Sequence, residues 1–118
     1  MYKVVLNVDY GQFALSLKAV EWLEQNGSNE TKEAIKDIRS YTLDDDDFLT
    51  FRVSIYFNNK RHNTDLVKVV ETLGAEANGL DACLETVEIL YNMYRIENND
   101  GAERLITPED KFNWTVIE

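Results

Sequence analysis

Apolar and polar side chains alternate along residues 2–9, which predicts a β-strand with one mostly buried face. That face would carry Tyr2, Val4, Leu6 and Val8. A short connection over residues 9–13 leads to a predicted helix over about 17–26, where apolar residues recur with helical spacing. Ser16 is the expected N-cap, and Gly27 is expected to end the helix in a left-handed conformation.

The middle of the chain predicts a second helix and a second strand. Residues 29–40 predict a weaker, mostly polar helix with a thin apolar stripe of Ala34, Ile35 and Ile38. Residues 41–47 are expected to form a loop. The alternation then returns over residues 48–57, which predicts a strand with a buried face of Phe51, Val53, Ile55 and Phe57.

The second half of the chain predicts one more helix and then only strands. Residues 64–73 form the predicted helix, which Asn63 caps and Gly74 ends. Four strands are predicted after it, over about 83–90, 93–97, 102–106 and 113–117. Asp100-Gly101 is typical of a tight hairpin turn between the second and third of these strands.

This order of elements predicts a single α+β domain over residues 1–118. Its centre would be a mostly antiparallel sheet of about five to six strands with two or three helices on one side. The length of 118 residues and the hydrophobic content of 44% agree with one folded domain.

Charge excludes several classes of partner. Twenty-two acidic residues against 12 basic ones give a net charge of −10. This balance argues against direct nucleic-acid binding and against docking on an anionic membrane. No apolar run approaches the ~20 residues that span a bilayer, and no signal-peptide pattern opens the chain, so we expect a soluble cytoplasmic protein. Cys83 is the only cysteine, which excludes an internal disulfide framework and a cysteine-based zinc cluster.

The residue inventory favours binding over catalysis. His62 is the only histidine, and we expect a polar surface residue rather than a general base. The four aspartates at 44–47 lack the ligand spacing of a calcium loop and are expected to form a solvated loop. We therefore expect no catalytic residues, no metal and no cofactor.

Two segments stand where a ligand can bind. Arg61 comes just before a predicted helix N-terminus, where free N–H groups favour anions and a guanidinium can bind phosphate or carboxylate. Pairing of Arg61 with Asp65 is equally compatible with the sequence. Because Arg61 lies off the apolar stripe of that helix, its replacement is expected to leave stability unchanged. Residues 10–13 precede another helix, where Gly11 would either admit a ligand to the backbone or form an ordinary turn.

Aromatic residues are frequent in the predicted C-terminal strands, namely Tyr91, Tyr94, Phe112 and Trp114. Such rings usually pack in a core. Where one faces outward, it can stack on a purine, with Arg95 or Arg104 beside it for phosphate.

Several blocks of this sequence resemble a pattern found in small proteins of tailed phages and prophages. The first block is Tyr10-Gly11-Gln12-Phe13-Ala14-Leu15-Ser16, followed by Ala19-Val20-Glu21-Trp22-Leu23. The second runs from Arg61-His62-Asn63-Thr64-Asp65-Leu66-Val67 to Gly74. Residues 77–79, 87–89, 94–97 and 100–103 complete a pattern that covers nearly the whole chain except about 28–50. On these blocks the chain resembles the first type of Thoeris anti-defence (Tad) proteins of phages.

The resemblance implies a small oligomeric α/β protein in the host bacterial cytoplasm. Such proteins sequester cyclic ADP-ribose isomers, and some hold cyclic oligonucleotides, without degrading them. The expected ligand-binding residues are Arg61, His62, Tyr10, Gly11, Phe13, Tyr94 and Arg104. Gln12 replaces the second glycine of the pattern, which restricts close approach of a ligand to that turn. Asn63-Thr64 replaces Asp-Pro and keeps a helix cap.

Two further expectations concern the oligomeric state of the protein and the alternative to a sponge function. We expect a homo-oligomer, because several short strands with aromatic residues leave apolar surface to cover. The alternative to a sponge is an acidic, anti-CRISPR-like inhibitor that blocks a bacterial defence protein, which agrees with the net charge of −10 and the run at residues 44–47. A hydrolase of a small nucleotide is supported least, since the chain lacks an evident catalytic set.

Overall fold

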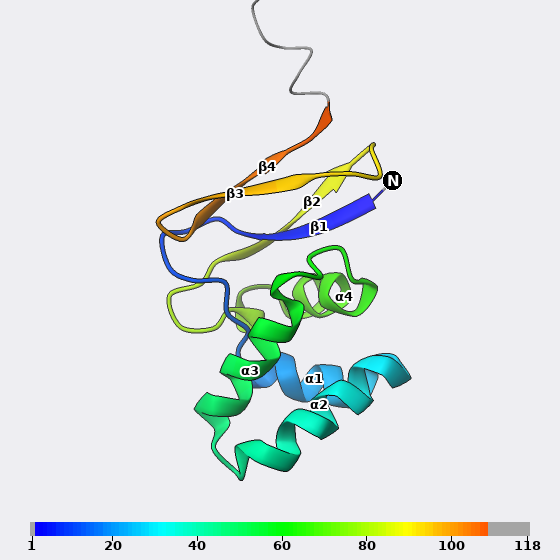
Figure 1. Ribbon diagram of the computed structural model, residues 1–118, viewed down its shortest axis with the longest axis vertical. Coiled ribbons are helices and arrows are strands. Elements are labelled where there is room, and N and C mark those ends of the chain that lie inside the picture. The colour runs from blue at the N-terminus through cyan, green and yellow to red at the C-terminus, as the bar shows by residue number, and fades with distance from the viewer. Residues whose placement is uncertain (1, 109–118) are drawn as a thin grey trace, which may run out of the picture.

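The computed structural model describes residues 2–108, which form an α+β fold (Figure 1). The fold class predicted from the sequence is therefore confirmed. Within the described range the elements are β1 (Tyr2–Asn7), α1 (Leu17–Asn26), α2 (Asn29–Thr42), α3 (Asp46–Asn58), α4 (Thr64–Leu73), the 3₁₀ helix η1 (Gly74–Ala77), β2 (Leu84–Ile89), β3 (Arg95–Asn99) and β4 (Ala102–Ile106).

The predicted single sheet of five to six strands is not what residues 2–108 form. They form two antiparallel sheets of two strands each, one from β1 and β2 and the other from β3 and β4. The same range holds four α-helices rather than two or three. The strand predicted over 113–117, together with Phe112, lies outside the described residues.

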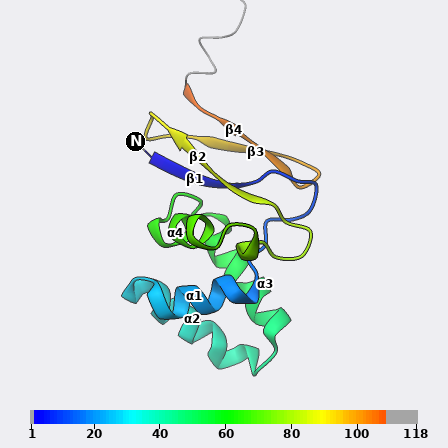
Figure 2. The same cartoon turned by 180° about the vertical axis from the view of Figure 1, so that it is seen from behind.

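Three layers are stacked in the described molecule (Figures 1 and 2). The β1–β2 sheet lies between the β3–β4 hairpin and the helices, so the helices cover one side as predicted. Val5 belongs to the core shared with the helices, whereas Val4 and Leu6 pack against the hairpin. The prediction of one buried face was therefore incomplete, because β1 is buried on both faces.

The capping residues place α1 and α4 where the sequence predicts them. The Ser16 side chain accepts from the Ala19 N–H at the start of α1, and Asn63 accepts from two N–H groups at the start of α4. Gly74, with a φ of 58°, ends α4 as expected. Gly27 also ends α1, but its φ of −72° is ordinary, so the predicted left-handed stop was wrong there.

The strand predicted over 48–57 was wrong, because this segment forms α3. Apolar residues stand at almost every position, so they satisfy a period of two and a helical spacing equally well. Asp45 decides between them, since its side chain accepts from the Phe48 N–H as an N-cap. In the helix Val53 and Phe57 are buried as predicted, but Phe51 and Ile55 are exposed.

The β3–β4 hairpin confirms the turn predicted from Asp100-Gly101. Both residues have positive φ, 54° and 99°, as a two-residue turn with the twist of the strands requires. Arg95 pairs with Ile106 at the open end of the hairpin, and Asn99 pairs with Ala102 at the turn. The turn itself is packed against the segment that follows β1, because a Cβ at Gly101 would lie 2.4 Å from the Tyr10 carbonyl oxygen.

Candidate functional site

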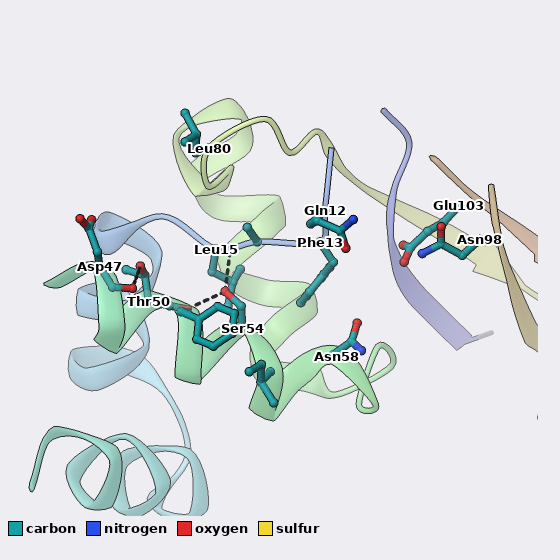
Figure 3. Close-up of a pocket in the computed structure, with 13 residues that line it drawn as sticks. Gln12, Phe13, Leu15, Asp47, Thr50, Ser54, Asn58, Leu80, Asn98 and Glu103 are labelled. Carbon is teal, nitrogen blue, oxygen red and sulfur yellow. Dashed lines mark hydrogen bonds between the residues drawn. The ribbon is translucent and has the colours of Figure 1, made fainter. Parts of the chain in front are cut away.

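An open groove of about 580 Å³ runs along α3, between that helix and residues 12–15. Its apolar lining includes Phe13, Phe51, Ile55 and Leu80. Its polar lining includes the side chains of Gln12, Asp47, Asn58, Asn98 and Glu103. Figure 3 shows Asp47 toward one end of α3 and Asn58 toward the other, with Asn98 and Glu103 beyond Asn58.

Arg61 lies behind this groove and is almost completely buried, with 3% of its surface exposed. Its guanidinium stacks over the Phe13 ring at 3.9 Å from the ring centre and forms an ion pair with both carboxylate oxygens of Glu103. The remaining bonds are donated to the Val5 carbonyl and to the carbonyl and side-chain oxygens of Asn58. All five N–H groups of Arg61 are therefore occupied.

This environment corrects both expectations for Arg61. The residue is not available for an anion at the helix mouth, because Glu103 already fills that role inside the fold. It does not pair with Asp65 either, since that carboxylate accepts hydrogen bonds from Ser28 and Thr31. A buried and fully bonded guanidinium also makes Arg61 important for stability, contrary to the sequence-based expectation.

Gly11 serves packing rather than ligand approach in this structure. A Cβ atom at Gly11 would lie 1.7 Å from the Asp81 carbonyl oxygen, so no side chain fits. A Cβ at Gly101 would lie 2.0 Å from the Gly11 carbonyl oxygen. The side chain of Asn7, which is fully buried, donates to the carbonyls of both glycines. The turn after β1 is thus enclosed by the backbone of two other segments.

His62 and Tyr94 contact each other, as two residues on the predicted ligand list. The Tyr94 hydroxyl lies 2.7 Å from Nδ1 of His62, and the rings meet edge to face. Burial raises the pKa of Tyr94, and the nearby charge of Arg61 opposes that shift. The hydroxyl therefore stays protonated near neutral pH and can donate to the imidazole.

The predicted ligand residues do not converge on one cavity. Phe13 lines the groove along α3, whereas Tyr94 and Arg61 line a second cavity of about 350 Å³. Tyr10, 72% exposed, and Arg104, whose side chain forms an ion pair with Glu97 at 3.4 Å, line neither of these two cavities.

The two cavities adjoin each other and share Asn58, Asn98 and Glu103. Arg95 lines the second cavity and makes no ion pair within residues 2–108. Sequence reasoning missed these asparagines, because Asn is common in polar turns and gives no sign of a shared cavity wall. Phe51 was missed as well, since the predicted strand placed it in the core.

Nothing in the groove resembles an activated nucleophile. The Ser54 hydroxyl donates to the Thr50 carbonyl at 2.6 Å and accepts from the Leu15 N–H at 2.9 Å, so it is held in place by the backbone. Within residues 2–108 no group of three or more His, Cys, Asp or Glu side chains is placed to hold a metal ion. No helix in that range is long and apolar enough to cross a membrane.

No known protein family, characterised protein or solved structure matches this chain. The chemistry of the site therefore rests on its own residues. They provide an exposed aromatic ring, amide groups without a partner within residues 2–108, and the cation Arg95 without an ion pair in that range, along two adjoining cavities. This arrangement suits stacking and hydrogen bonding to a small polar ring system.

Proposed function

We propose that this protein is a phage anti-defence sponge, which binds a cyclic nucleotide signal in the host cytoplasm and holds it intact. The observation that carries the proposal is the groove along α3 with the adjoining cavity at Arg95. A volume of about 580 Å³ falls within the ~300–1,000 Å³ typical of small-molecule sites. The resemblance described above gives the class of ligand.

Phe51 is the best platform for a base in this groove. It lines the groove with 59% of its surface exposed, whereas one face of the Phe13 ring is already covered by Arg61. The amide NH₂ groups of Asn58 and Asn98 have no partner within residues 2–108 and can donate to ring nitrogens or ribose oxygens. Stacking and amide recognition together favour a purine nucleotide.

Charge orients the ligand along the two cavities. Asp47 stands at one end of the groove and repels phosphate, and Arg95 lines the cavity beyond the other end. Glu103 lies between them, but Arg61 neutralises its carboxylate. The phosphates of the ligand are therefore expected at Arg95, and its base is expected over Phe51.

The direct test is to incubate the protein with a panel of cyclic nucleotides, denature it by heat and analyse what is released. A sponge releases the ligand intact, an enzyme releases an altered product, and absence of any bound nucleotide contradicts the proposal. Arg95→Ala is expected to weaken binding by about tenfold to a hundredfold, since a hydrogen bond to a charged group contributes ~1.5–3 kcal/mol. Arg104→Ala removes the same charge from the next strand, outside both cavities, and should bind normally.

A second candidate function is favoured by an apolar stripe on α3 that begins at the groove and extends beyond it. Phe48, Phe51 and Ile55 form an exposed apolar stripe, and the aspartates at 44–47 stand at the N-terminal end of the helix. An apolar stripe next to acidic residues suits a protein partner with basic residues around an apolar pocket, as a protein-blocking inhibitor would require. Phe48→Ala separates the two functions, because Phe48 does not line the groove. This change would weaken a protein complex and leave nucleotide binding unchanged.

A further inference from the structure

The two edges of the β1–β2 sheet differ in whether their outward backbone N–H and C=O groups have hydrogen-bond partners. Along the outer edge of β1, the Val5 N–H donates to the Arg61 carbonyl at 2.8 Å, and the Asn7 N–H donates to the Glu103 carboxylate at 2.7 Å. The Val5 carbonyl accepts from the Arg61 guanidinium. This edge is therefore closed by groups from two other segments, which protects it against pairing with another chain.

The outer edge of β2 is open instead. The Val8 N–H donates to the Cys83 carbonyl, and the antiparallel register from that pair turns the backbone groups of residues 84, 86 and 88 away from β1. The Leu84 N–H is satisfied by the side chain of Asn78. Within residues 2–108, the N–H and C=O groups of Thr86 and Glu88 have no partner.

The side chain of Thr86 is a second observation on the same strand. The Thr86 hydroxyl oxygen is buried and has no hydrogen-bond partner in the part of the chain that the structure describes. A buried hydroxyl without a partner is costly, and native proteins rarely keep one. An acceptor delivered along the open edge would remove that cost.

We propose that β2 pairs antiparallel with β2 of a second copy of this chain, which joins the two sheets into one of four strands. Val87 lies opposite Val87 of the second copy, and Thr86 lies opposite Glu88 in both directions. In this register the unpaired N–H and C=O groups of Thr86 and Glu88 bond to each other, and Leu84 keeps its bond to Asn78. Each copy therefore makes the same contacts to the other, as a twofold axis requires.

The side chains agree with this register. Thr86 and Glu88 directly opposite each other lie on one face of the sheet, so a rotation of the Thr86 side chain about χ1 would let its buried hydroxyl donate to the carboxylate of the second copy. Glu85 lies opposite Ile89 rather than another glutamate, so no like charges face each other despite the net charge of −10. Leu90, which is 70% exposed, comes opposite Leu84 of the second copy and gains apolar contact.

Amide hydrogen exchange tests the proposal on the unmodified chain. The amides of Thr86 and Glu88 are expected to gain protection as protein concentration rises, together with a rise in mass toward twice the monomer value of 13.7 kDa. The Val87 amide, which bonds to β1, is expected to stay protected at every concentration. A 13.7 kDa particle throughout, or a dimer in which Thr86 and Glu88 exchange freely, would overturn the proposal.

Two variants test the pairing itself. Glu88→Pro removes the outward N–H at a position where an edge strand tolerates proline, and it is expected to leave a folded monomer. Glu88→Ala keeps that N–H and is expected to remain a dimer, with weaker association. Should Glu88→Pro fail to fold, Val87→Cys with Cys83→Ser decides the register. Oxidation is expected to link the two copies through residue 87, whereas Glu85→Cys in the same background stays unlinked, and the reverse result would refute the register.

Discussion

Two buried polar clusters hold this molecule together, and they use opposite solutions. The interlayer cluster consists of Asn7, Arg61 and Glu103, and it neutralises a buried cation with a buried carboxylate. The helix cluster consists of Ser28, Thr31 and Asp65, and within residues 2–108 it surrounds a carboxylate with hydroxyl and backbone N–H donors rather than with an ion pair. The interlayer cluster joins distant segments of the chain, because Arg61 and Glu103 are separated by 42 positions.

The comparison of the two clusters shows where loss of a charged partner would destabilise the fold. In the interlayer cluster, loss of either partner leaves the other charged and buried, because neither side chain exposes more than 4% of its surface. In the helix cluster, the Asp65 carboxylate that loses a hydrogen-bond donor can be neutralised by taking up a proton. The interlayer cluster is also the back wall of the candidate site, since Phe13 stacks on Arg61 and Glu103 lines both cavities.

Glu103→Ala is expected to cause the largest loss of stability. It leaves the Arg61 guanidinium unpaired and removes the acceptor of the Asn7 N–H, so the free energy of unfolding should fall by about 3–5 kcal/mol. Urea denaturation measures this change. The double replacement of Arg61 by Met and Glu103 by Leu leaves no unpaired charge and is expected to lose less than Glu103→Ala alone. A loss below ~1 kcal/mol for Glu103→Ala would mean that the pair is not buried in solution.

Asn7→Ala is expected to come next. Its side-chain NH₂ donates to the carbonyls of Asp9, Gly11 and Gly101, and its side-chain oxygen accepts from the Cys83 N–H. Several buried groups lose their partner at once, so we expect a loss of about 2–3 kcal/mol by thermal or urea unfolding. Asn26→Ala is the matched control, because its amide donates only to an exposed helix carbonyl. Equal losses in both variants would contradict the role of Asn7.

The helix cluster should respond to pH. Burial opposes the charge on Asp65, but the hydrogen bonds from Thr31 and Ser28 outweigh burial, and the pKa of Asp65 lies below its ordinary value of 3.8. A lowered pKa in the folded state contributes stability above the unfolded value, and that stability is lost as pH falls from about 4 through the folded pKa.

Asp65→Asn tests that dependence. At pH 7 it is expected to lower the free energy of unfolding by about 1.5 kcal/mol, because the carboxylate bonds are lost. Below pH 4 the difference from the natural chain should shrink, since the natural chain then loses its own contribution. Melting curves at pH 7 and pH 3 measure both effects. A difference that stays constant between these two pH values would exclude the ionised carboxylate as the cause.

Replacement of exposed aspartates in the run at 44–47 is expected to change stability and nucleotide binding least. Replacing Asp44, Asp45 and Asp46 by Asn leaves Asp47 in the groove and keeps a helix cap at position 45, because Asn caps about as well as Asp. Stability should stay within about 0.5 kcal/mol of the natural value. Calorimetry with the released nucleotide should show unchanged affinity. A clear loss of binding to a basic protein partner, with a flatter salt dependence, would instead favour the inhibitor function.

What the sequence predicts depends on whether the signal is local. Ser16 and Asn63 mark helix starts because a cap acts within three residues, and Asp100-Gly101 marks a turn for the same reason. The helix α3 was missed because its apolar residues satisfy two periods at once. A local signal exists at Asp45, which caps α3 but stands in a run of four aspartates that is equally typical of a solvated loop.

The site could not be predicted in the same way. Arg61 next to a helix start suggests an anion site, but its partner Glu103 stands 42 positions away and carries no mark of the pairing. The groove depends on how α3 packs against the turn after β1, so a strand predicted over 48–57 gives no sign that Phe51 lines it. Residues that act through long-range packing leave no pattern in a single sequence.

The central position of β1 has a consequence for the order of folding. Its partners are far away in the chain, since Asn7 is 76 positions from Cys83, which directly precedes β2, and 94 positions from Gly101 in the β3–β4 turn. A ribosome adding about 5–20 residues per second makes β1 roughly 4–15 s before β2 emerges. The capped helices can form within that interval from local contacts, whereas β1 waits with its apolar residues exposed. Closure of this long loop, rather than helix formation, should therefore set the folding rate.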